Sequence, residues 1–390
     1  MASSKARIAV VFGTRPEAIK LAPVVRVARA LGDWECHVIA SGQHVELARQ
    51  VIGELGLGVD RELAVMRAGQ SLAALTSRLV EAIDGALEAA APDFVVVQGD
   101  TTTAMAAALA AFYRRIPVAH VEAGLRTGDR SAPFPEEMNR LLVARLADLH
   151  LAPTPRARAA LLAEGIDAAA IEVTGNTVVD AMAWQLARLP ADGAPPPGPD
   201  AGRLRAFAGA RPLVLVTGHR RESFGGGLEA VCGGIAELAA AYPGVDFVYP
   251  VHLNPRVQAA VAAGLGGRAN VHLLPPVGYA AALWLLRRAR LVITDSGGLQ
   301  EEAPGAGTPA LVTRAATERP EAQERGYARL VGHDRELLVR SARTWLEDQA
   351  AYAAAVARES PFGDGRAAER AVAAIRQRLG LAAAEVPAWP

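Results

Sequence analysis

The stretch VITDSGGLQEE, residues 292–302, contains the local pattern from which the fold can be inferred. An apolar run ends in an acid and a hydroxyl, two glycines follow, and the next residues have the composition of a helix. Glycine lets the backbone approach a ligand closely, and the free N–H groups at the start of a helix attract anions. Ser296, Gly297 and Gly298 therefore form a candidate phosphate-binding turn, unless the glycines only make a tight joint between strand and helix.

Two residues near this turn favour a nucleotide as the ligand. Glu302, in the first turns of the expected helix, can accept hydrogen bonds from both hydroxyls of a ribose. Arg319, in the loop ATERPEA after the next strand, can hold a phosphate with two hydrogen bonds, although an arginine in a loop is often only solvated. Together with the glycine turn, these residues predict a nucleotide site in the second half of the chain.

The same order of strand, turn and helix recurs along the chain and predicts the fold class. Apolar runs such as RIAVVFG, DFVVVQGD, PLVLVTG and VDFVYPVH alternate with longer helical patterns. Strands joined by helices make parallel sheets with right-handed crossovers, and continuous β-branched runs indicate burial on both faces. We expect an α/β protein of two doubly wound Rossmann-like domains with a cleft between them. Ligands of such sheets bind beyond the carboxyl ends of the strands.

A segment rich in proline and glycine, PADGAPPPGPDAG, separates the two halves. It is too poor in apolar side chains to pack, and it cannot sustain a helix. We expect a first domain at residues 1–188, a linker at 189–210, and a second domain at 211–390 that includes the C-terminal helices. The chain has 390 residues, and a domain with a single hydrophobic core is usually smaller than this. The length therefore agrees with two domains.

The composition argues against several classes of partner. Lysine plus arginine and aspartate plus glutamate both total 41, so no global field favours nucleic acid or a membrane. Cys36 and Cys232 are far apart, no metal-binding motif occurs, and a GxGxxA match from Gly225 lies too far from its strand for a nicotinamide, so we expect no metal and no cofactor. No apolar run reaches the roughly 18 residues of a membrane span and no signal peptide precedes the first strand, so we expect a cytoplasmic protein.

Acids follow two strands of the first half. Asp100 in GDTTT and Glu122 in HVEAGLRTG both close apolar runs, so a parallel sheet would bring them to the same edge, and Glu136 follows in PEEMNR. Carboxylates held close together cannot all ionise freely, so such a group can supply both an acid and a base. Two structural alternatives remain open: Asp100 could cap the next helix, and Glu136 could form a helical ion pair with Arg140.

Cations follow the first strand of each half. Arg15 and Lys20 in GTRPEAIK could converge on a polyanion, or could form a surface ion pair with Glu17. His219 in TGHRRES follows the first strand of the second half. Next to a diphosphate, this histidine could donate a proton to the leaving oxygen.

Nine motifs in fixed order give the chain a close resemblance to the non-hydrolysing UDP-N-acetylglucosamine 2-epimerases. The motifs are FGTRPEAIKLAP, GDTTT, HVEAGLRTG, PEEMNR, GNTVVDA, TGHRRESFGGG, YPVHLNP, TDSGGLQEEAP and TERPEA. The resemblance implies the GT-B architecture, UDP on the second domain at the glycine turn, Glu302 and Arg319, and His219 at the diphosphate. It implies that Asp100, Glu122 and Glu136 serve carbon 2 of the sugar, and that Arg15 and Lys20 approach from the first domain.

The resemblance also implies the reaction and its partners. UDP-N-acetylglucosamine would be converted reversibly to UDP-N-acetylmannosamine by anti elimination of UDP to 2-acetamidoglucal and re-addition. A homodimer is implied, as is a second UDP-N-acetylglucosamine molecule that activates the enzyme through positions matched by Gln43 and His252. The rivals are a hydrolysing 2-epimerase, a GT-B glycosyltransferase and a non-enzymatic sensor. In the hydrolysing branch a proline commonly follows the histidine matched by His219, whereas here Arg220 follows.

Overall fold

The computed structural model describes residues 5–42, 51–67, 69–218, 226–357 and 359–389. The chain divides into two compact units, one made of Met1–Ala181 with Phe362–Pro390 and the other of Met182–Pro361. Both units are α/β, as the alternation of strands and helices predicts. The C-terminal residues differ from the expectation, because the sequence analysis assigned them to the second domain and the structure packs them with the first.

The first unit is built on a parallel sheet of seven strands in the order β3-β2-β1-β4-β5-β6-β7. The strands are β1 (Arg7–Phe12), β2 (Glu35–Ala40), β3 (Arg61–Glu62), β4 (Phe94–Gln98), β5 (Val118–Val121), β6 (Leu149–Ala152) and β7 (Ile171–Val173). The helices are α1 (Arg15–Leu31), α3 (Leu72–Ala90), α4 (Thr102–Tyr113), α5 (Glu136–Leu146), α6 (Pro155–Ala163), α7 (Thr177–Leu186) and α16 (Ala367–Arg378), with a short 3-10 turn η1 (Ala168–Ala170).

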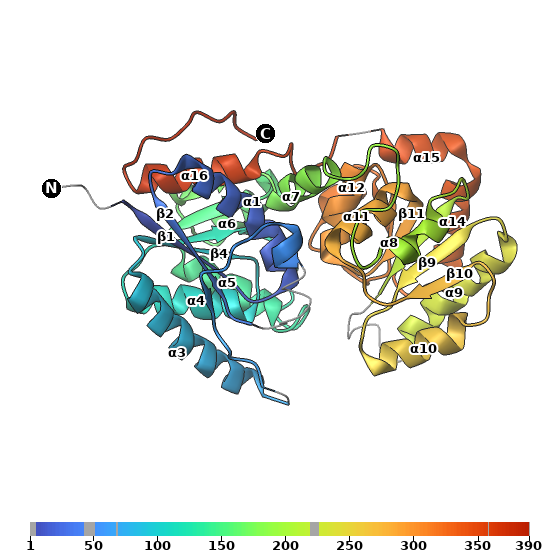
Figure 1. The fold of residues 1–390 in the computed structure, drawn as a ribbon, viewed down its shortest axis with the longest axis horizontal. Helices are drawn as coiled ribbons and strands as arrows, with labels where there is room; N and C mark the ends of the chain where they lie inside the picture. The colour runs from blue at the N-terminus through green and yellow to red at the C-terminus, as the bar shows by residue number, and fades with distance from the viewer. Residues whose placement is uncertain (1–4, 43–50, 68, 219–225, 358, 390) are drawn as a thin grey trace. The chain divides into compact units, whose positions relative to one another are not determined.

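Helices cover both faces of this sheet, which explains why its central strands are apolar throughout. Every residue of β4 and β5 is buried. Figure 1 shows α3 and α4 together on one face, where they pack with the central strands into one apolar core, and α1 beside α16 on the other. The alanine-rich sequence of α4 suits this position, since small side chains let helix and sheet approach closely. A sheet buried in this way exposes its functional side chains only beyond the strand ends.

The second unit repeats the plan with a parallel sheet of six strands in the order β10-β9-β8-β11-β12-β13. The strands are β8 (Leu213–Thr217), β9 (Asp246–Pro250), β10 (Val271–Leu274), β11 (Ala289–Thr294), β12 (Ala310–Val312) and β13 (Ala328–Leu330). The helices are α8 (Ala201–Leu204), α9 (Gly227–Ala241), α10 (Pro255–Leu265), α11 (Tyr279–Arg288), α12 (Gly297–Ala306), α13 (Pro320–Glu324), α14 (Arg335–Glu347) and α15 (Gln349–Val356), with η2 (Arg205–Phe207) after α8. Helices α9, α10 and α14 pack together, and α11 contacts α12 (Figure 1).

The C-terminal helix α16 belongs to the first unit for a physical reason. Ala371 and Ile375 are fully buried where α16 lies against α1. Arg376 adds a bidentate ion pair with Asp33, with hydrogen bonds of 2.8 and 2.6 Å. Asp180 accepts hydrogen bonds from the first backbone N–H groups of α16. Helical spacing in the sequence predicts α16 itself but not the sheet it packs against.

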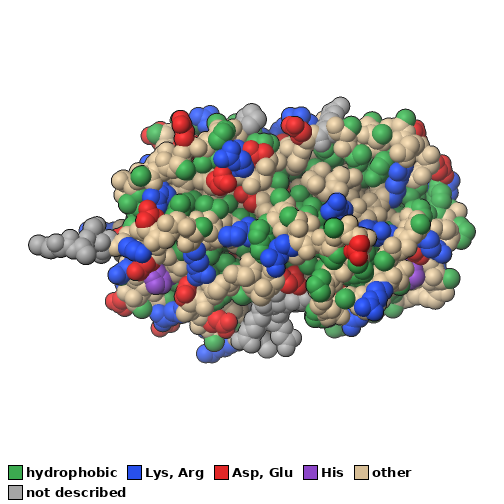
Figure 2. All heavy atoms as spheres, turned by 45° about the horizontal axis from the view of Figure 1, so that its top comes forward, with side chains coloured by type: hydrophobic (Ala, Val, Ile, Leu, Met, Phe, Trp, Pro, Cys, Tyr) green, Lys and Arg blue, Asp and Glu red, His purple; other side chains and the backbone are tan. Residues whose placement is uncertain are grey.

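Surface charge is mixed on the face shown in Figure 2, where basic and acidic side chains are both scattered. Among the described helices, none is long and apolar enough to cross a membrane. Within the same described residues, no group of three or more histidine, cysteine, aspartate or glutamate side chains could hold a metal ion.

Replacing Gly124 by alanine should disrupt the segment that follows β5. Gly124 has φ +91°, and a Cβ there would lie 2.2 Å from the carbonyl oxygen of Ala157. Gly165 is the control, because it has φ +81° and nothing lies within 4 Å of its Cβ position. Gly165→Ala should therefore cost only the backbone strain, about 1–2 kcal/mol, and Gly124→Ala clearly more. Thermal unfolding measures both, and equal losses would contradict the close approach.

Candidate functional site

The carboxyl edge of the first sheet carries the two acids that the sequence predicted there. β4 ends at Gln98 and β5 at Val121, so Asp100 and Glu122 follow neighbouring strands. Glu122 has φ +65°, in the left-handed region that residues other than glycine seldom adopt. Such a conformation costs about 1–3 kcal/mol and persists only where the surroundings enforce it.

Glu122 is buried against a cation and an amide. Lys20 donates a hydrogen bond from Nζ to Glu122 Oε2, and both side chains are almost fully buried. Asn176 donates from Nδ2 to the same oxygen over 3.1 Å. Lys20 therefore does not form the surface ion pair with Glu17 that was one of its two alternatives. It is buried and reaches Glu122 at the end of β5.

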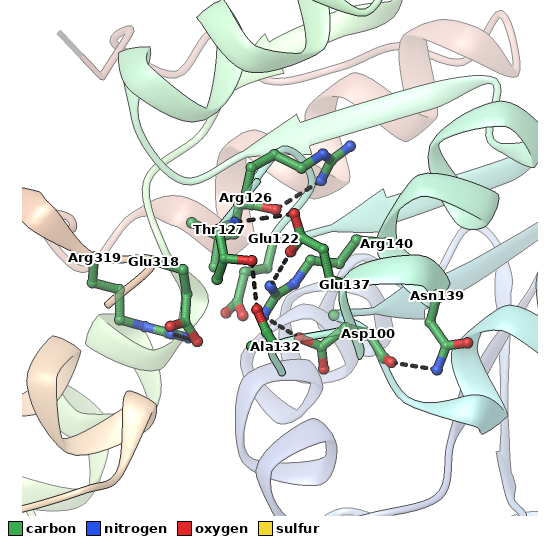
Figure 3. Close-up of polar contacts among 12 residues, drawn as sticks. Asp100, Glu122, Arg126, Thr127, Ala132, Glu137, Asn139, Arg140, Glu318 and Arg319 are labelled. Atoms are coloured by element: carbon green, nitrogen blue, oxygen red, sulfur yellow. Dashed lines mark hydrogen bonds and ion pairs between the residues drawn. The ribbon is translucent and has the colours of Figure 1, made fainter. Parts of the chain in front are cut away.

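Asp100 takes part in a second charged group, shown in Figure 3. Arg140 of α5 lies 2.5 Å from Asp100 through Nη2, and through Nη1 it donates to Glu137 Oε2 over 2.8 Å. The backbone N–H groups of Thr127 and Gly128 donate to the other oxygen of Glu137, both at 3.1 Å. Arg140 therefore contacts Asp100 and Glu137, three residues before it on the same helix, and the ion pair with Glu136 considered from the sequence stays a prediction.

Glu136, the third predicted acid, is the first residue of α5 and is partly buried. The next residues of this helix brace Asp100, because Asn139 donates from Nδ2 to the Asp100 carbonyl oxygen over 2.9 Å. Of the two alternatives left open for Asp100, the one in which it caps the following helix is wrong. Thr101 is the N-cap of α4, and its Oγ1 accepts from the Ala104 N–H. The Asp100 carboxylate is thus available to Arg140.

His120 supports the same loop and was not predicted from the sequence. Its Nε2–H donates to the Gly99 carbonyl oxygen over 2.7 Å, which ties β5 to the loop that carries Asp100. Burial lowers the pKa of His120 to about 3, so the ring is neutral at physiological pH and keeps this hydrogen bond. Its position inside an apolar strand gave no signal of this role, because the acceptor lies in the loop after the neighbouring strand β4.

Glu17, named from the sequence only as a possible surface partner of Arg15 and Lys20, is buried and has a structural role that the sequence did not predict. Its carboxylate accepts hydrogen bonds from the N–H groups of Gly13 and Thr14 at 3.0 and 2.7 Å. It also accepts from Thr101 Oγ1 at 2.7 Å, so it links the loop after β1 to the start of α4. Burial raises the pKa of Glu17 to about 7. Arg15, the first residue of α1, lies in the loop region that this carboxylate stabilises.

The second unit builds the predicted turn at the end of β11. Ser296 is the N-cap of α12, and its backbone N–H donates to Thr294 Oγ1 over 2.9 Å. A Cβ on Gly297 would lie 2.7 Å from Arg319 Nη1, so only glycine lets the guanidinium pass this close. At Gly298 the nearest such contact is 3.9 Å. Glu302 is buried on the same helix.

Arg319 is held by carboxylates and is not a solvated loop residue. It is 5% exposed, donates from Nε to Glu301 Oε1 over 2.5 Å, and contacts Glu318 Oε1 through Nη1 at 2.5 Å. Arg314 pairs with the other oxygen of Glu318 at 2.9 Å. The structure therefore brings a buried network of two arginines and two glutamates to the start of α12, where the sequence predicted an anion.

Of the three remaining predicted site residues, the structure describes only His252. His219 and Gln43 lie outside the described residues. His252 follows β9, and its Nδ1 accepts a hydrogen bond from the Asn254 N–H over 3.1 Å. The second substrate molecule and the homodimer stay predictions.

The fold and the family follow from comparison with known proteins. Two doubly wound units define a GT-B protein, and the solved glycosyltransferase SnogD from Streptomyces nogalater, 17% identical with a TM-score of 0.56, shows the same fold over 96% of this chain and 99% of its own. The family model described as UDP-N-acetylglucosamine 2-epimerase matches residues 28–376. This chain belongs to that family, as the nine motifs predicted.

Relatives cover the chain almost completely. A UDP-N-acetylglucosamine 2-epimerase of Yersinia pestis is 45% identical over 371 residues, which is 95% of this chain and 98% of the relative. The crystal structure of UDP-GlcNAc 2-epimerase from Neisseria meningitidis bound to UDP-GlcNAc is 39% identical with a TM-score of 0.89. It covers 96% of this chain and 99% of its own.

Glu17→Gln should remove a pH dependence of stability. The folded state favours the neutral acid, because the pKa is about 7 against an ordinary 4.5. Wild-type stability is therefore highest below the ordinary value and is lost as pH rises through about 7, whereas glutamine does not titrate. We therefore compare the melting temperature of Glu17→Gln with that of wild type at two pH values. The difference, variant minus wild type, should be several degrees larger at about pH 8 than at about pH 5.

Glu81→Gln, an exposed change on α3, is the control and should follow wild type at both pH values. If the difference in melting temperature between wild type and Glu17→Gln is the same at both pH values, Glu17 does not titrate in this range.

Proposed function

We propose that this protein interconverts UDP-N-acetylglucosamine and UDP-N-acetylmannosamine without releasing the sugar. The observation that carries the proposal is the buried group of Lys20, Glu122 and Asn176 beside Asp100 and Arg140 at one sheet edge. Membership of the 2-epimerase family supports it, as does a relative crystallised with UDP-GlcNAc. A sugar-nucleotide sensor would have no need for two acids paired with buried cations at this edge.

The chemistry of carbon 2 explains why acids are needed. Its hydrogen is not adjacent to a carbonyl, so direct removal of the proton would leave an unstabilised carbanion. In the proposed reaction the bond from carbon 1 to the UDP oxygen breaks and the carbon 2 proton passes to a base, which gives 2-acetamidoglucal and UDP. UDP then adds back to carbon 1 while a proton reaches the opposite face of carbon 2. One carboxyl group can remove the proton and another can supply it.

Glu122 and Asp100 of the first unit could serve as this acid and base, and they differ in burial and in their cationic partners. Glu122 is buried with Lys20, while Asp100 has a quarter of its side chain exposed and pairs with Arg140. Glu136 begins the helix that carries Arg140. We assign these three acids to carbon 2, where they would also stabilise positive charge developing on the sugar ring. Arg15 and Lys20 would balance the negative charge of the substrate.

We assign UDP to the second unit. The N–H groups at the start of α12, next to Ser296 and Gly297, can donate to phosphate oxygens, and the helix dipole favours the anion. Arg319 stands beside this turn, and Glu302 on the same helix is assigned to the ribose hydroxyls. His219 is the proposed proton donor to the departing diphosphate.

Incubation with UDP-N-acetylglucosamine alone in deuterated water tests the proposal. Because carbon 2 exchanges its proton in the elimination, we expect deuterium at carbon 2 of sugar that is still attached to UDP. Mass spectrometry and proton NMR of the products measure this. Free N-acetylmannosamine would instead identify the hydrolysing reaction. An unchanged substrate would leave either a glycosyltransferase, which needs an acceptor, or a non-enzymatic sensor.

Asp100→Asn and Glu122→Gln should each lower kcat by about 10²–10⁴-fold, the usual contribution of a positioned acid or base. Both changes keep the shape of the side chain but remove its ability to transfer a proton. Glu172→Gln, at an exposed position of β7, is the matched control and should keep wild-type turnover. Turnover near the wild-type rate in either site variant would remove that residue from the assignment.

A further inference from the structure

Asn176 of the GNTVVDA motif has a side chain whose orientation is settled by two hydrogen bonds. It precedes α7, is 2% exposed, and accepts from the Val178 N–H through Oδ1 at 3.1 Å. Its Nδ2 donates to Glu122 Oε2 at 3.1 Å. A backbone N–H can only donate, so the amide oxygen must face Val178 and the amide nitrogen must face Glu122. The helix start thus directs a donor at the acid.

The backbone around Asn176 is held by the C-terminal segment of the chain. The Asn176 N–H donates to the Phe362 carbonyl oxygen over 2.6 Å. Gly175, with φ +83°, packs against Gly363, whose Cα would lie 3.4 Å from a Cβ at this position. These contacts join residues that are far apart in the chain, and they place Phe362 and Gly363 against the backbone of Gly175 and Asn176.

Two buried charged side chains fasten this C-terminal segment. Arg370 donates to the Thr174 carbonyl oxygen over 3.0 Å and forms a bidentate pair with Asp364, with hydrogen bonds of 2.8 and 2.6 Å. Asp180 accepts from the Ala367 and Ala368 N–H groups at 3.2 and 2.8 Å. Within the GNTVVDA motif, Asp180 therefore binds the start of α16 and Asn176 binds Glu122.

Glu122 needs a directional partner because its backbone is strained and the lysine that donates to it is flexible. Lys20 supplies charge, but an ammonium group on a four-carbon stem sets no plane for the carboxylate. The planar amide of Asn176 does set one, since its own orientation is fixed. Both donors contact Oε2, so the lysine balances the charge while the asparagine determines where the carboxylate points.

We propose that Asn176 is a positioning residue for Glu122, and that the C-terminal segment at residues 362–370 completes the active unit by holding Asn176 in place. The inference rests on the proposed function only for the catalytic role of Glu122.

Asn176→Ser and Asn176→Asp separate positioning from helix capping. Serine and aspartate both cap helices well, so a purely structural cap predicts near-wild-type activity for both. If Asn176 positions Glu122, serine loses the amide donor and is too short for its hydroxyl to replace it, while aspartate adds a repelling charge, so aspartate should be at least as impaired. We expect kcat to fall by about 10–100-fold with KM little changed, the usual effect of misplacing a catalytic group. Asp348→Ser, at the N-cap of α15, is the control and should keep the wild-type kcat.

A double-mutant cycle with Glu122→Gln identifies the residue through which Asn176 acts. If the asparagine only positions this carboxylate, Asn176→Ser should change kcat less than about twofold in the Glu122→Gln background. A role in folding alone would give the same loss in both backgrounds and would overturn the inference.

Crystal structures of wild type and Asn176→Ser give a result that does not depend on turnover. The Glu122 carboxylate should turn away from its wild-type direction while α7 stays in place. An unchanged carboxylate would overturn the inference. If wild type fails to exchange deuterium at carbon 2, the proposed function is wrong, and these two structures still decide whether Asn176 orients Glu122.

Discussion

Charged side chains buried at the ends of parallel strands need partners, and the first unit depends on this constraint. An isolated charge taken out of water costs several kcal/mol, and removing one member of a buried pair typically costs about 3–5 kcal/mol. Lys20 of α1 reaches Glu122 at the end of β5, and Arg140 of α5 reaches Asp100 in the loop after β4. These pairs balance the charges of the two acids, whereas the direction of the Glu122 carboxylate is assigned to the hydrogen bond from Asn176.

The second unit meets the same constraint where it binds an anion in the proposed reaction. Arg314 and Arg319 are balanced by Glu301 and Glu318, so the arginine beside the start of α12 keeps its position before any ligand arrives. Preorganised cations of this kind stabilise a departing diphosphate without first reorganising. Gly297 leaves the space that the Arg319 guanidinium occupies, since any side chain at position 297 would displace it.

Not every buried acid in the first unit has a cation beside it in this way. Glu17 is held by two backbone N–H groups and a hydroxyl, and its pKa rises to about 7 through burial. It joins the loop after β1 to the start of α4, and His120, neutral through burial, joins β5 to the loop after β4. These hydrogen bonds hold the loop that carries the proposed catalytic acid Asp100 and the loop that precedes Arg15.

The sequence by itself determined the two parallel sheets, the glycine turn after β11 and the placement of Asp100 and Glu122 at one sheet edge. These features are local or periodic: each strand, helix and turn is encoded by adjacent residues, and parallel strands bring their carboxyl ends together. Only the tertiary structure decided that Thr101 caps α4 and that Lys20 pairs with Glu122. It also decided that residues 362–390 return to the first unit. Such choices depend on burial and on hydrogen-bond geometry between residues far apart in the chain, which no local pattern contains.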